Sequence, residues 1–537
     1  MGRARRVVKS VLLMLAVVAP VGAAAQDTVS ARPFTYLIRG GTVVDGTGAA
    51  SFTGDVAVAG DRIVRVSRTP LDPTQAQHVI DARGLVVAPG FIDSHAHVEN
   101  LADHPLAESF LRQGVTTVWY APDGGMPWPL SEAMTRLERT THAPNIAFFA
   151  GHNTVRREVM GTANRAPTPA ELEQMKALVA QAMEEGAIGL STGLRYVPGI
   201  YSETDEVIEL ARVAARYGGF YSSHIRDESA GSLDAVREVI RIAAEAGLPA
   251  QVSHHKLMGQ PQWGQSVQTL ALIDSARDRG LDVTIDQYPY DATSTGTAVL
   301  FPAWSLSGGG DSLRARLADP QQRRTIIEGM RATILTERGG GDLTRIRIAR
   351  YGAEPSWNGR TFADIARERG REPDTDFAIE LGIEIQSAGG ASGVWHVVDE
   401  SDIRRIMQHP WTMISSDGGI GVPGVGHPHP RGYGAFARVL GRYVRDEPVL
   451  TLEEAIRKMT SLPAWRMRDD RRGRIAEGLL ADLALFDPLT FEDRATYEDP
   501  HQYAVGMKHV FVAGVPVLSA GEFTGATPGR VLRRGHE

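Results

Sequence analysis

Histidine and aspartate side chains stand at the ends of several apolar, strand-like runs of this sequence. His95 and His97 close VVAPGFIDSHAH, His224 closes FYSSH, His254 follows AQVS, and Asp417 closes WTMISSD. Side chains at positions i and i+2 of a strand point the same way, so His95 and His97 leave it together. One H-x-H pair is weak evidence, but Zn²⁺ takes both imidazole and carboxylate ligands. The repeated strand-end pattern therefore predicts a metal site.

Such a site could hydrolyse a bond to nitrogen. A bound metal ion lowers the pKa of a coordinated water to ~7. An aspartate that touches this water can accept its proton and pass it to a leaving nitrogen, and Asp417 fits that role by its position. Each histidine taken singly is more often a hydrogen-bonded structural residue. The histidines and Asp417 taken together favour the metal site.

The segments that would position these residues alternate between strands and helices. Eight apolar strand candidates run from the one with His95 to the one with Asp417, and most are separated by helical stretches. Thr168 to Glu171 combines an N-cap, a proline and a capping-box glutamate, and further helices are expected from Ser202 to Gly218 and from Ser232 to Gly247. The alternation predicts an α/β fold, a (β/α)8 TIM-like barrel with its active site at the C-terminal ends of the strands.

Two regions depart from the barrel pattern. Residues 305–405, between strands 7 and 8 of the barrel, are too long for a loop, which predicts an inserted subdomain over the barrel mouth. Residues 26–88 and 471–537 carry short β-branched runs divided by glycine and aspartate turns. We expect these two segments to form one small β-sandwich beside the barrel of residues 89–470.

The N-terminus has the layout of a secretory signal peptide. A basic stretch, MGRARRVVKS, precedes the apolar run VLLMLAVVA, which is too short to span a bilayer, and three alanines end at Ala25. Residues 1–25 are therefore predicted to be a signal peptide cleaved near Ala25, with the mature protein secreted or periplasmic. The chain has no cysteine, which excludes disulfides, thiolate ligands and a cysteine nucleophile.

The length of the chain bears on the number of domains, and its net charge bears on the kinds of partner that it could bind. The 537 residues exceed the length at which single cores stop growing, so more than one domain is expected. A formal net charge of −7 gives no reason to expect nucleic acid or an anionic membrane surface as partner. No later segment predicts membrane insertion, and nothing in the sequence determines the oligomeric state.

The motifs resemble those of the amidohydrolase superfamily and, within it, of the D-aminoacylases (N-acyl-D-amino-acid deacylases). The resemblance runs from about residue 36 to the C-terminal strands, and the order and spacing of its motifs make it specific. The matching pieces are PGFIDSHAH, GVTTV, GHNTVRREVMG, GAIGLSTGLRYVPGIYSETDE, SSHIRDE, VSHHK, YPYDATST, SSDGG, HPRGYG, LTLEEAIRKMTSLPA and LLADLALFDP.

The resemblance implies hydrolysis of an N-acyl-D-amino acid to a carboxylate and a free D-amino acid. It also implies a zinc centre of one or two ions, with Asp417 as general acid and base, and a substrate pocket beside it. Lys256 would hold the substrate carboxylate, in keeping with the point charge of a lysine. The metal ligands implied are His95, His97, His224 and His254, and the other pocket positions are Tyr196, Tyr288 and Ser294.

One departure from the family pattern concerns the second strand. The family has a metal-binding cysteine where this chain has Asp123, in GVTTVWYAPDGG, and the fourth strand, AIGLST, has no lysine that could bridge two metals. Asp123 could bind metal through oxygen, or it could only cap the Pro122-Asp123-Gly124 turn. The metal count, one or two, stays open between these two interpretations.

Other functions fit the same residues. The site could act on a D- or iso-dipeptide, a cyclic amide or a lactone, because a shared fold does not determine the substrate. A third hypothesis is a non-catalytic barrel that binds its ligand without turnover. Arg226 and Arg431 could each bind an anion or form a salt bridge. Metal analysis and a panel of amide substrates separate these alternatives.

Overall fold

The structure, a computed structural model, describes residue 2 and residues 32–534. Apart from residue 2, the predicted signal peptide lies outside the described residues. Among the residues described, no helix combines the length and the apolar character needed to cross a membrane.

The centre of the molecule is a closed barrel of eight parallel strands, as the sequence predicts. One arc pairs β6, β7 and β8, and the other pairs β9 to β13 with β17. Two strands join the arcs: β8 continues past Phe149 into β9, and β17 continues past residues 415–417 into β18, which pairs with β6. The barrel strands are β6 (Phe91–His97), β7 (Val115–Tyr120), β8 (Asn145–Phe148) with β9 (Ala150–Gly151), β10 (Gly189–Gly193), β11 (Phe220–His224), β12 (Ala250–Val252), β13 (Val283–Gln287), and β17 (Thr412–Ile414) with β18 (Gly418–Gly419).

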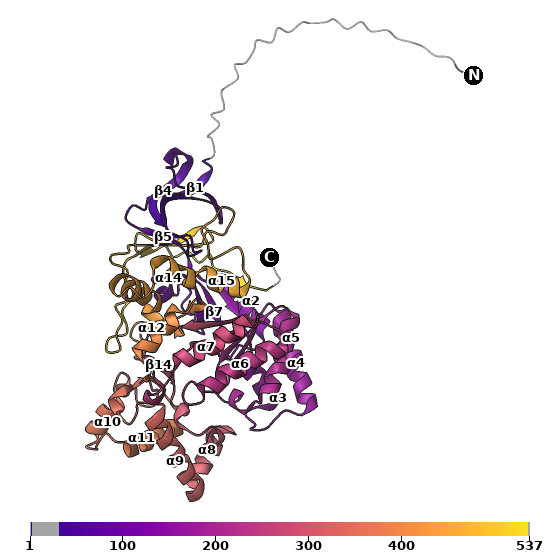
Figure 1. The fold of residues 1–537 in the computed structure, drawn as a ribbon, viewed down its shortest axis with the longest axis vertical. Coiled ribbons are helices and arrows are strands. Elements are labelled where there is room, and N and C mark those ends of the chain that lie inside the picture. Colours follow the sequence, from indigo (N-terminus) through magenta and orange to yellow (C-terminus); the bar gives the residue numbers. More distant parts are fainter. Residues whose placement is uncertain (1, 3–31, 535–537) are drawn as a thin grey trace.

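Helices follow most of the strands and cover the outside of the barrel (Figure 1). Thr168 caps α4 through the predicted capping box, accepting from the Glu171 amide at 3.3 Å. The predicted stop of α6 is also confirmed, since Gly247 ends it in the left-handed conformation. The helices around the barrel are α1 (Glu108–Leu111), α2 (Leu130–Thr140), α3 (His152–Met160), α4 (Pro169–Glu184), α5 (Thr204–Arg216), α6 (Ser232–Ala246), α7 (Ser266–Asp278), α12 (Glu400–Gln408), α13 (Arg431–Arg438), α14 (Leu452–Met459) and α15 (Ser461–Met467).

The segment between β13 and α12 builds a sheet of its own, β14-β16-β15, covered by helices. This sheet begins at Ala292 and ends at His396, so its limits differ from the predicted 305–405. The first strand, ATSTG, has no large apolar residue to reveal it in the sequence, and α12 packs against α7 and β17 of the barrel. The elements are β14 (Ala292–Gly296), α8 (Gly309–Ala318), α9 (Pro320–Thr336), β15 (Ile346–Arg350), α10 (Phe362–Glu368), α11 (Thr375–Ser387) and β16 (Ser392–His396).

Strands from the two ends of the chain pair in one nine-stranded sheet, in which β5 meets β19 through the antiparallel pair Val87 and Leu485. The last strand, β23 (Val531–Leu532), leaves this sheet and pairs with β8 of the barrel. Figure 1 shows β1 and β4 at one end of the molecule and α8 to α11 at the other. The sheet contains β1 (Phe34–Val43), β2 (Phe52–Ala59), β3 (Arg62–Ser67), β4 (Ala76–Asp81), β5 (Val86–Pro89), β19 (Leu483–Phe486), β20 (Met507–Val512), β21 (Val515–Ser519) and β22 (Glu522–Phe523).

A buried charge network fastens α3 to α5 beside the barrel mouth. The Glu206 carboxylate of α5 accepts from His152 at 2.9 Å and from Arg156, both on α3, and Arg156 is fully buried. The next residue of α3, Asn153, hydrogen-bonds both backbone groups of Gly193, and Thr154 donates its amide to the Gly124 carbonyl at 3.0 Å. The network thus steadies the turn that presents Asp123.

We predict that Glu206→Gln destabilises the protein by about 3–5 kcal/mol, because Arg156 loses its buried counter-charge. Burial raises the pKa of Glu206, but the opposing effect of His152 and Arg156 is larger. The pKa therefore lies below its ordinary value. The stabilisation should therefore be complete above the unfolded-state pKa of about 4.3 and should disappear as the pH falls below it. Denaturant unfolding of both proteins between pH 3 and pH 7 tests this.

Glu209→Gln is the matched control, since Glu209 lies three residues further along α5 in partly exposed pairs with Lys176 and Arg212. Its loss should change the stability by about 1 kcal/mol or less. Equal effects of the two substitutions would contradict the assigned role of Glu206.

Candidate metal centre

The polar residues predicted from the strand ends meet at one mouth of the barrel. His254 (φ +33°) and Asp417 (φ +48°) have left-handed backbones, which is costly for residues with a side chain. The conformation is held by hydrogen bonds from the His254 amide to Asp286 at 3.0 Å and from the Asp417 amide to the His95 carbonyl at 2.8 Å. These bonds help to aim both side chains into the mouth. The residues that meet there are His95, His97, Asp123, His224, His254 and Asp417.

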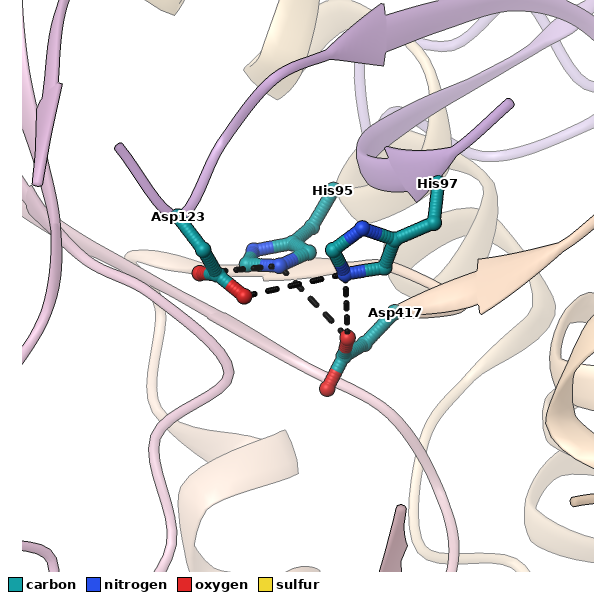
Figure 2. A group of neighbouring side chains, drawn as sticks. All are labelled: His95, His97, Asp123 and Asp417. Atoms are coloured by element: carbon teal, nitrogen blue, oxygen red, sulfur yellow. Dashed lines mark hydrogen bonds and ion pairs between the residues drawn. The ribbon is translucent and has the colours of Figure 1, made fainter. Parts of the chain in front are cut away.

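The first group contains His95, His97, Asp123 and Asp417 (Figure 2). The Asp417 Oδ1 atom lies 3.2 Å from His97 Nε2 and 3.6 Å from His95 Nε2. From the other side, Asp123 reaches His95 Nε2 at 3.4 Å and His97 Nε2 at 3.6 Å. One nitrogen or oxygen atom from each of the four residues therefore faces a common centre.

Asp123 is shared with a second group that contains His224 and His254. Its Oδ1 atom lies 3.5 Å from His254 Nε2 and 3.8 Å from His224 Nδ1. The carboxylate therefore stands between the two groups, where one oxygen or both can face a cation. This placement favours the ligand interpretation of Asp123 over a role confined to the turn.

The donor atoms fit a metal ion better than they fit one another. Among the described residues, His95 Nε2, His224 Nδ1 and Asp123 Oδ1, which face this centre, have no hydrogen-bond partner, although buried polar atoms are normally satisfied. Ligands about 2.1 Å from a tetrahedral ion lie about 3.4 Å from one another. The separations of 3.2–3.8 Å between the facing atoms are of this size.

The charges favour a cation at the same place. Burial raises the pKa of Asp123, but His95 and His254 hold it well below its ordinary value. Burial and Lys256 lower the pKa of His254, yet the nearby carboxylates raise it to about 10. Burial lowers the pKa of His224 to about 3, so its ring is neutral at pH 7, the form in which histidine binds metal.

Sequence reasoning missed Glu228, which lies behind the second group. Its Oε1 atom is 2.5 Å from Lys256 Nζ and 3.0 Å from His254 Nδ1, while Oε2 is 3.6 Å from His224 Nε2. Glu228 therefore faces the ring nitrogen that each histidine turns away from Asp123. Carboxylates in this position orient metal-binding histidines. The only signal in the sequence is an acid four residues after His224.

Asp286 is a second residue that sequence reasoning missed. It is fully buried at the end of β13 and lies 3.6 Å from His95 Nδ1. Its carboxylate also accepts from the side chains of Gln251 at 2.5 Å and Ser415 at 2.8 Å. The strand-end rule, applied to DVTIDQYPY, would have found it. His255, by contrast, faces away from the centre and bonds Thr269 at 2.8 Å.

A cavity of about 580 Å³ opens beside the centre, and all four predicted pocket residues line it. Lys256 Nζ lies 5.5 Å from the centre of the Tyr288 ring, and the Tyr196 ring lies 4.5 Å from that of His224. Ser294 belongs to β14, so the segment between β13 and α12 supplies part of the cavity wall. The bulky Trp119 is fully buried in the barrel core and does not line the cavity.

The two arginines considered in the sequence have different surroundings. Arg431 is buried at the cavity wall and donates to Asp417 Oδ2 at 2.5 Å. Arg226 pairs with Glu238 at 2.7 Å and does not line the cavity. Both therefore form salt bridges, but only Arg431 touches the centre.

Comparison with known proteins agrees with this geometry. Residues 78–518 match the sequence model of the amidohydrolase family. The chain is 37% identical to a D-aminoacylase of Alcaligenes xylosoxydans xylosoxydans, over 94% of this chain and 98% of the relative. It is 36% identical to an N-acyl-D-glutamate deacylase of the same organism, over 93% of this chain and 96% of the relative.

Solved structures similar to this one also include a D-aminoacylase and a related deacylase. A D-aminoacylase described as having a binuclear metal centre matches with a TM-score of 0.79 and 37% identity, over 94% of this chain and all of that one. An N-acyl-D-glutamate deacylase from Bordetella bronchiseptica, complexed with zinc and a phosphonate inhibitor, matches with a TM-score of 0.78 and 34% identity, over 93% and 99% of the two chains.

We predict that Asp123→Ala lowers the metal content of the purified protein, because both groups of ligands lose the oxygen that they share. Elemental analysis should show fewer metal ions per chain than in the wild type. The control is Asp291→Asn, a half-exposed carboxylate hydrogen-bonded to the Tyr497 hydroxyl and absent from the cavity wall. An unchanged metal content in Asp123→Ala would leave Asp123 as a turn residue.

Proposed function

Because the chain belongs to the amidohydrolase family, we propose that it is a metal-dependent hydrolase of N-acyl-D-amino acids. The products are a carboxylate and a free D-amino acid. The observation that carries the proposal is the meeting of four histidines with Asp123 and Asp417 beside a cavity that contains a lysine. Similarity to D-aminoacylase and to N-acyl-D-glutamate deacylase over nearly the whole chain supports the substrate class.

The ligand groups suit one or two Zn²⁺ ions. Asp123, His224 and His254 would hold one ion, and His95, His97, Asp123 and Asp417 would hold the other. When bound, such an ion lowers the pKa of water and polarises a carbonyl group. Similarity to a zinc-complexed deacylase supports zinc as the metal.

Asp417 is proposed as the residue that moves the proton. Burial raises its pKa, but Arg431 and the histidines hold that pKa far below its ordinary value, so the group is ionised at neutral pH. Arg431 occupies Oδ2, so Oδ1, the atom that would also face an ion in the His95–His97 group, is the one placed to accept a proton from a water beside that ion. The protonated acid then donates to the nitrogen of the departing amino acid.

Lys256 is proposed to hold the α-carboxylate of the substrate. Its ammonium group is buried, oriented by Glu228, and lies in the wall that Tyr196, Tyr288 and Ser294 share. The Tyr288 hydroxyl is buried and has no hydrogen-bond partner in the described part of the chain, so it has a donor to offer. A point charge flanked by hydroxyl groups suits a carboxylate.

We further propose the finer domain division predicted from the sequence. Residues 26–88 and 471–537 would form a small β-sandwich, which is supported by their strands pairing in one sheet. Residues within 305–405 would form the main part of an inserted subdomain. Residues 1–25 would be a signal peptide that directs the protein to the periplasm or outside the cell, on the basis of their basic, apolar and small-residue order.

We predict that the enzyme hydrolyses N-acetyl-D-amino acids and not the matching N-acetyl-L-amino acids. A chelator should abolish the activity, and added Zn²⁺ should restore it, because the proposed chemistry requires the metal. The assay should also include dipeptides, a cyclic amide and a lactone. Turnover confined to L-forms or to cyclic substrates would overturn the proposed function.

For Asp417→Asn we predict a loss in kcat of about 10²–10⁴-fold, the usual contribution of a general acid and base. The asparagine keeps the shape of the side chain and cannot accept the proton. Metal bound by Asp123, His224 and His254 should remain, as measured by elemental analysis of the same sample. A variant that keeps more than a tenth of the wild-type kcat would exclude this role.

A further inference from the structure

Arg338 is a buried cation that faces the cavity without a counter-charge. It follows α9, lines the cavity and is only 2% exposed. Within the described residues, the only hydrogen bond of its side chain runs from Nη1 to Thr293 Oγ1 at 3.3 Å, and no carboxylate lies within 4.0 Å of the guanidinium. Its Nε atom is also buried and has no hydrogen-bond partner among those residues.

The other buried arginines of the described chain each have a carboxylate partner. Arg156 pairs with Glu206, Arg431 with Asp417, Arg466 with Asp282, and Arg472 with both Asp469 and Asp482. A charge removed from water is costly unless an opposite charge accompanies it. Burial, and then the nearby Arg195, lower the pKa of Arg338, which shows the same cost.

The two carboxylates whose charges act on Arg338 already form salt bridges with other residues. Glu337 pairs with Arg195 at 2.7 Å, and Glu228 pairs with Lys256 at 2.5 Å. Neither acid is free to pair with Arg338, so an anion for it would come from a molecule that enters the cavity. Arginine presents five N–H donors in a planar fork that matches a carboxylate, and Thr293 accepts from only one end of it.

The cavity thus contains two separate cationic side chains besides Arg431. Lys256 is paired with Glu228 and is proposed above to hold the α-carboxylate, whereas Arg338 has no carboxylate partner among the described residues. Thr293, which touches Arg338, is the neighbour on β14 of Ser294, whose carbonyl lies 3.5 Å from Arg431 Nη2. One strand therefore contacts both Arg338 and the arginine that binds Asp417, and both arginines line the same cavity.

We propose that Arg338 binds the side-chain carboxylate of the substrate, so that the preferred substrates are N-acylated acidic D-amino acids. This inference rests on the proposed function and specifies its substrate class. Overall identity does not decide the point, because the chain is 37% identical to a D-aminoacylase and 36% identical to an N-acyl-D-glutamate deacylase.

The test compares each acidic substrate with its neutral isostere. We would measure kcat/KM for N-acetyl-D-glutamate and N-acetyl-D-aspartate against N-acetyl-D-glutamine and N-acetyl-D-asparagine, with N-acetyl-D-leucine as a further neutral substrate. The wild type should favour each acid over its amide by about 100-fold or more, since a neutral group leaves the buried guanidinium unpaired. Equal or better turnover of the neutral substrates would overturn the inference and leave the proposed function standing.

Arg338→Met should lower kcat/KM for the acidic substrates by about 100-fold, which is the size of the wild-type preference for acid over amide. The kcat/KM for the neutral substrates should stay within about threefold of the wild-type value. Arg338→Lys should keep part of the preference, which a purely structural role would not explain. The matched control is Arg350→Met, because Arg350 lines the same cavity but is exposed, and it should keep the preference. An equal loss on all substrates in Arg338→Met, or loss of the preference in Arg350→Met alone, would refute the role of Arg338.

A binding measurement separates this inference from the proposed function. Metal-loaded Asp417→Asn should bind N-acetyl-D-glutamate about 100-fold more tightly than N-acetyl-D-glutamine by calorimetry, and adding Arg338→Met should remove the difference. This difference in affinity would support the acidic subsite even if the wild type hydrolysed none of the substrates. The absence of hydrolysis would by itself overturn the proposed function. Equal affinities for the acid and the amide would overturn the subsite.

Discussion

The candidate site depends on one carboxylate, that of Asp123, which lies within 3.4–3.8 Å of nitrogens from four histidines. Three barrel strands, β6, β11 and β12, bring those histidines to it, and within each of the two groups the separations match those of ligands around one cation. The orphaned nitrogens of His95 and His224 follow from the same arrangement. Cations held in the two ligand groups would satisfy the nitrogens that face Asp123, His95 Nε2 and His224 Nδ1, which is why the metal is central to the proposed chemistry.

The surrounding structure keeps that carboxylate and its histidines in position. Asn153 and Thr154 at the start of α3 hold the turn at Gly124, and Glu206 fastens α3 to α5. A side chain at residue 124 would meet Asn153 Oδ1 at 2.2 Å, and its φ of +76° also favours glycine. Behind the histidines, Glu228 and Asp286 fill the positions of orienting carboxylates. Buried polar groups behind the ligands therefore help to determine where the ligands point.

The charged side chains of the cavity wall differ in whether they have a partner of opposite charge within the protein. Asp417 is neutralised by Arg431, and Lys256 is paired with Glu228, so both pairs are balanced within the protein. Arg338 alone among the buried arginines of the described chain lacks a carboxylate partner. It comes from the segment between β13 and α12, the same segment that supplies Ser294 to the wall. The barrel would then provide the chemistry and this segment the substrate preference.

The sequence by itself determined the barrel and the positions of its strand-end residues, because alternating strands and helices with clear caps are local features. His95, His224, His254 and Asp417 could be selected for the same reason, since parallel strands of a barrel end at one mouth. Whether Asp123 faces the histidines or only its own turn was decided by tertiary structure. So were the roles of Glu228 and Asp286 and the missing partner of Arg338. Each of these depends on distances between residues far apart in the chain, and no local pattern carries that information.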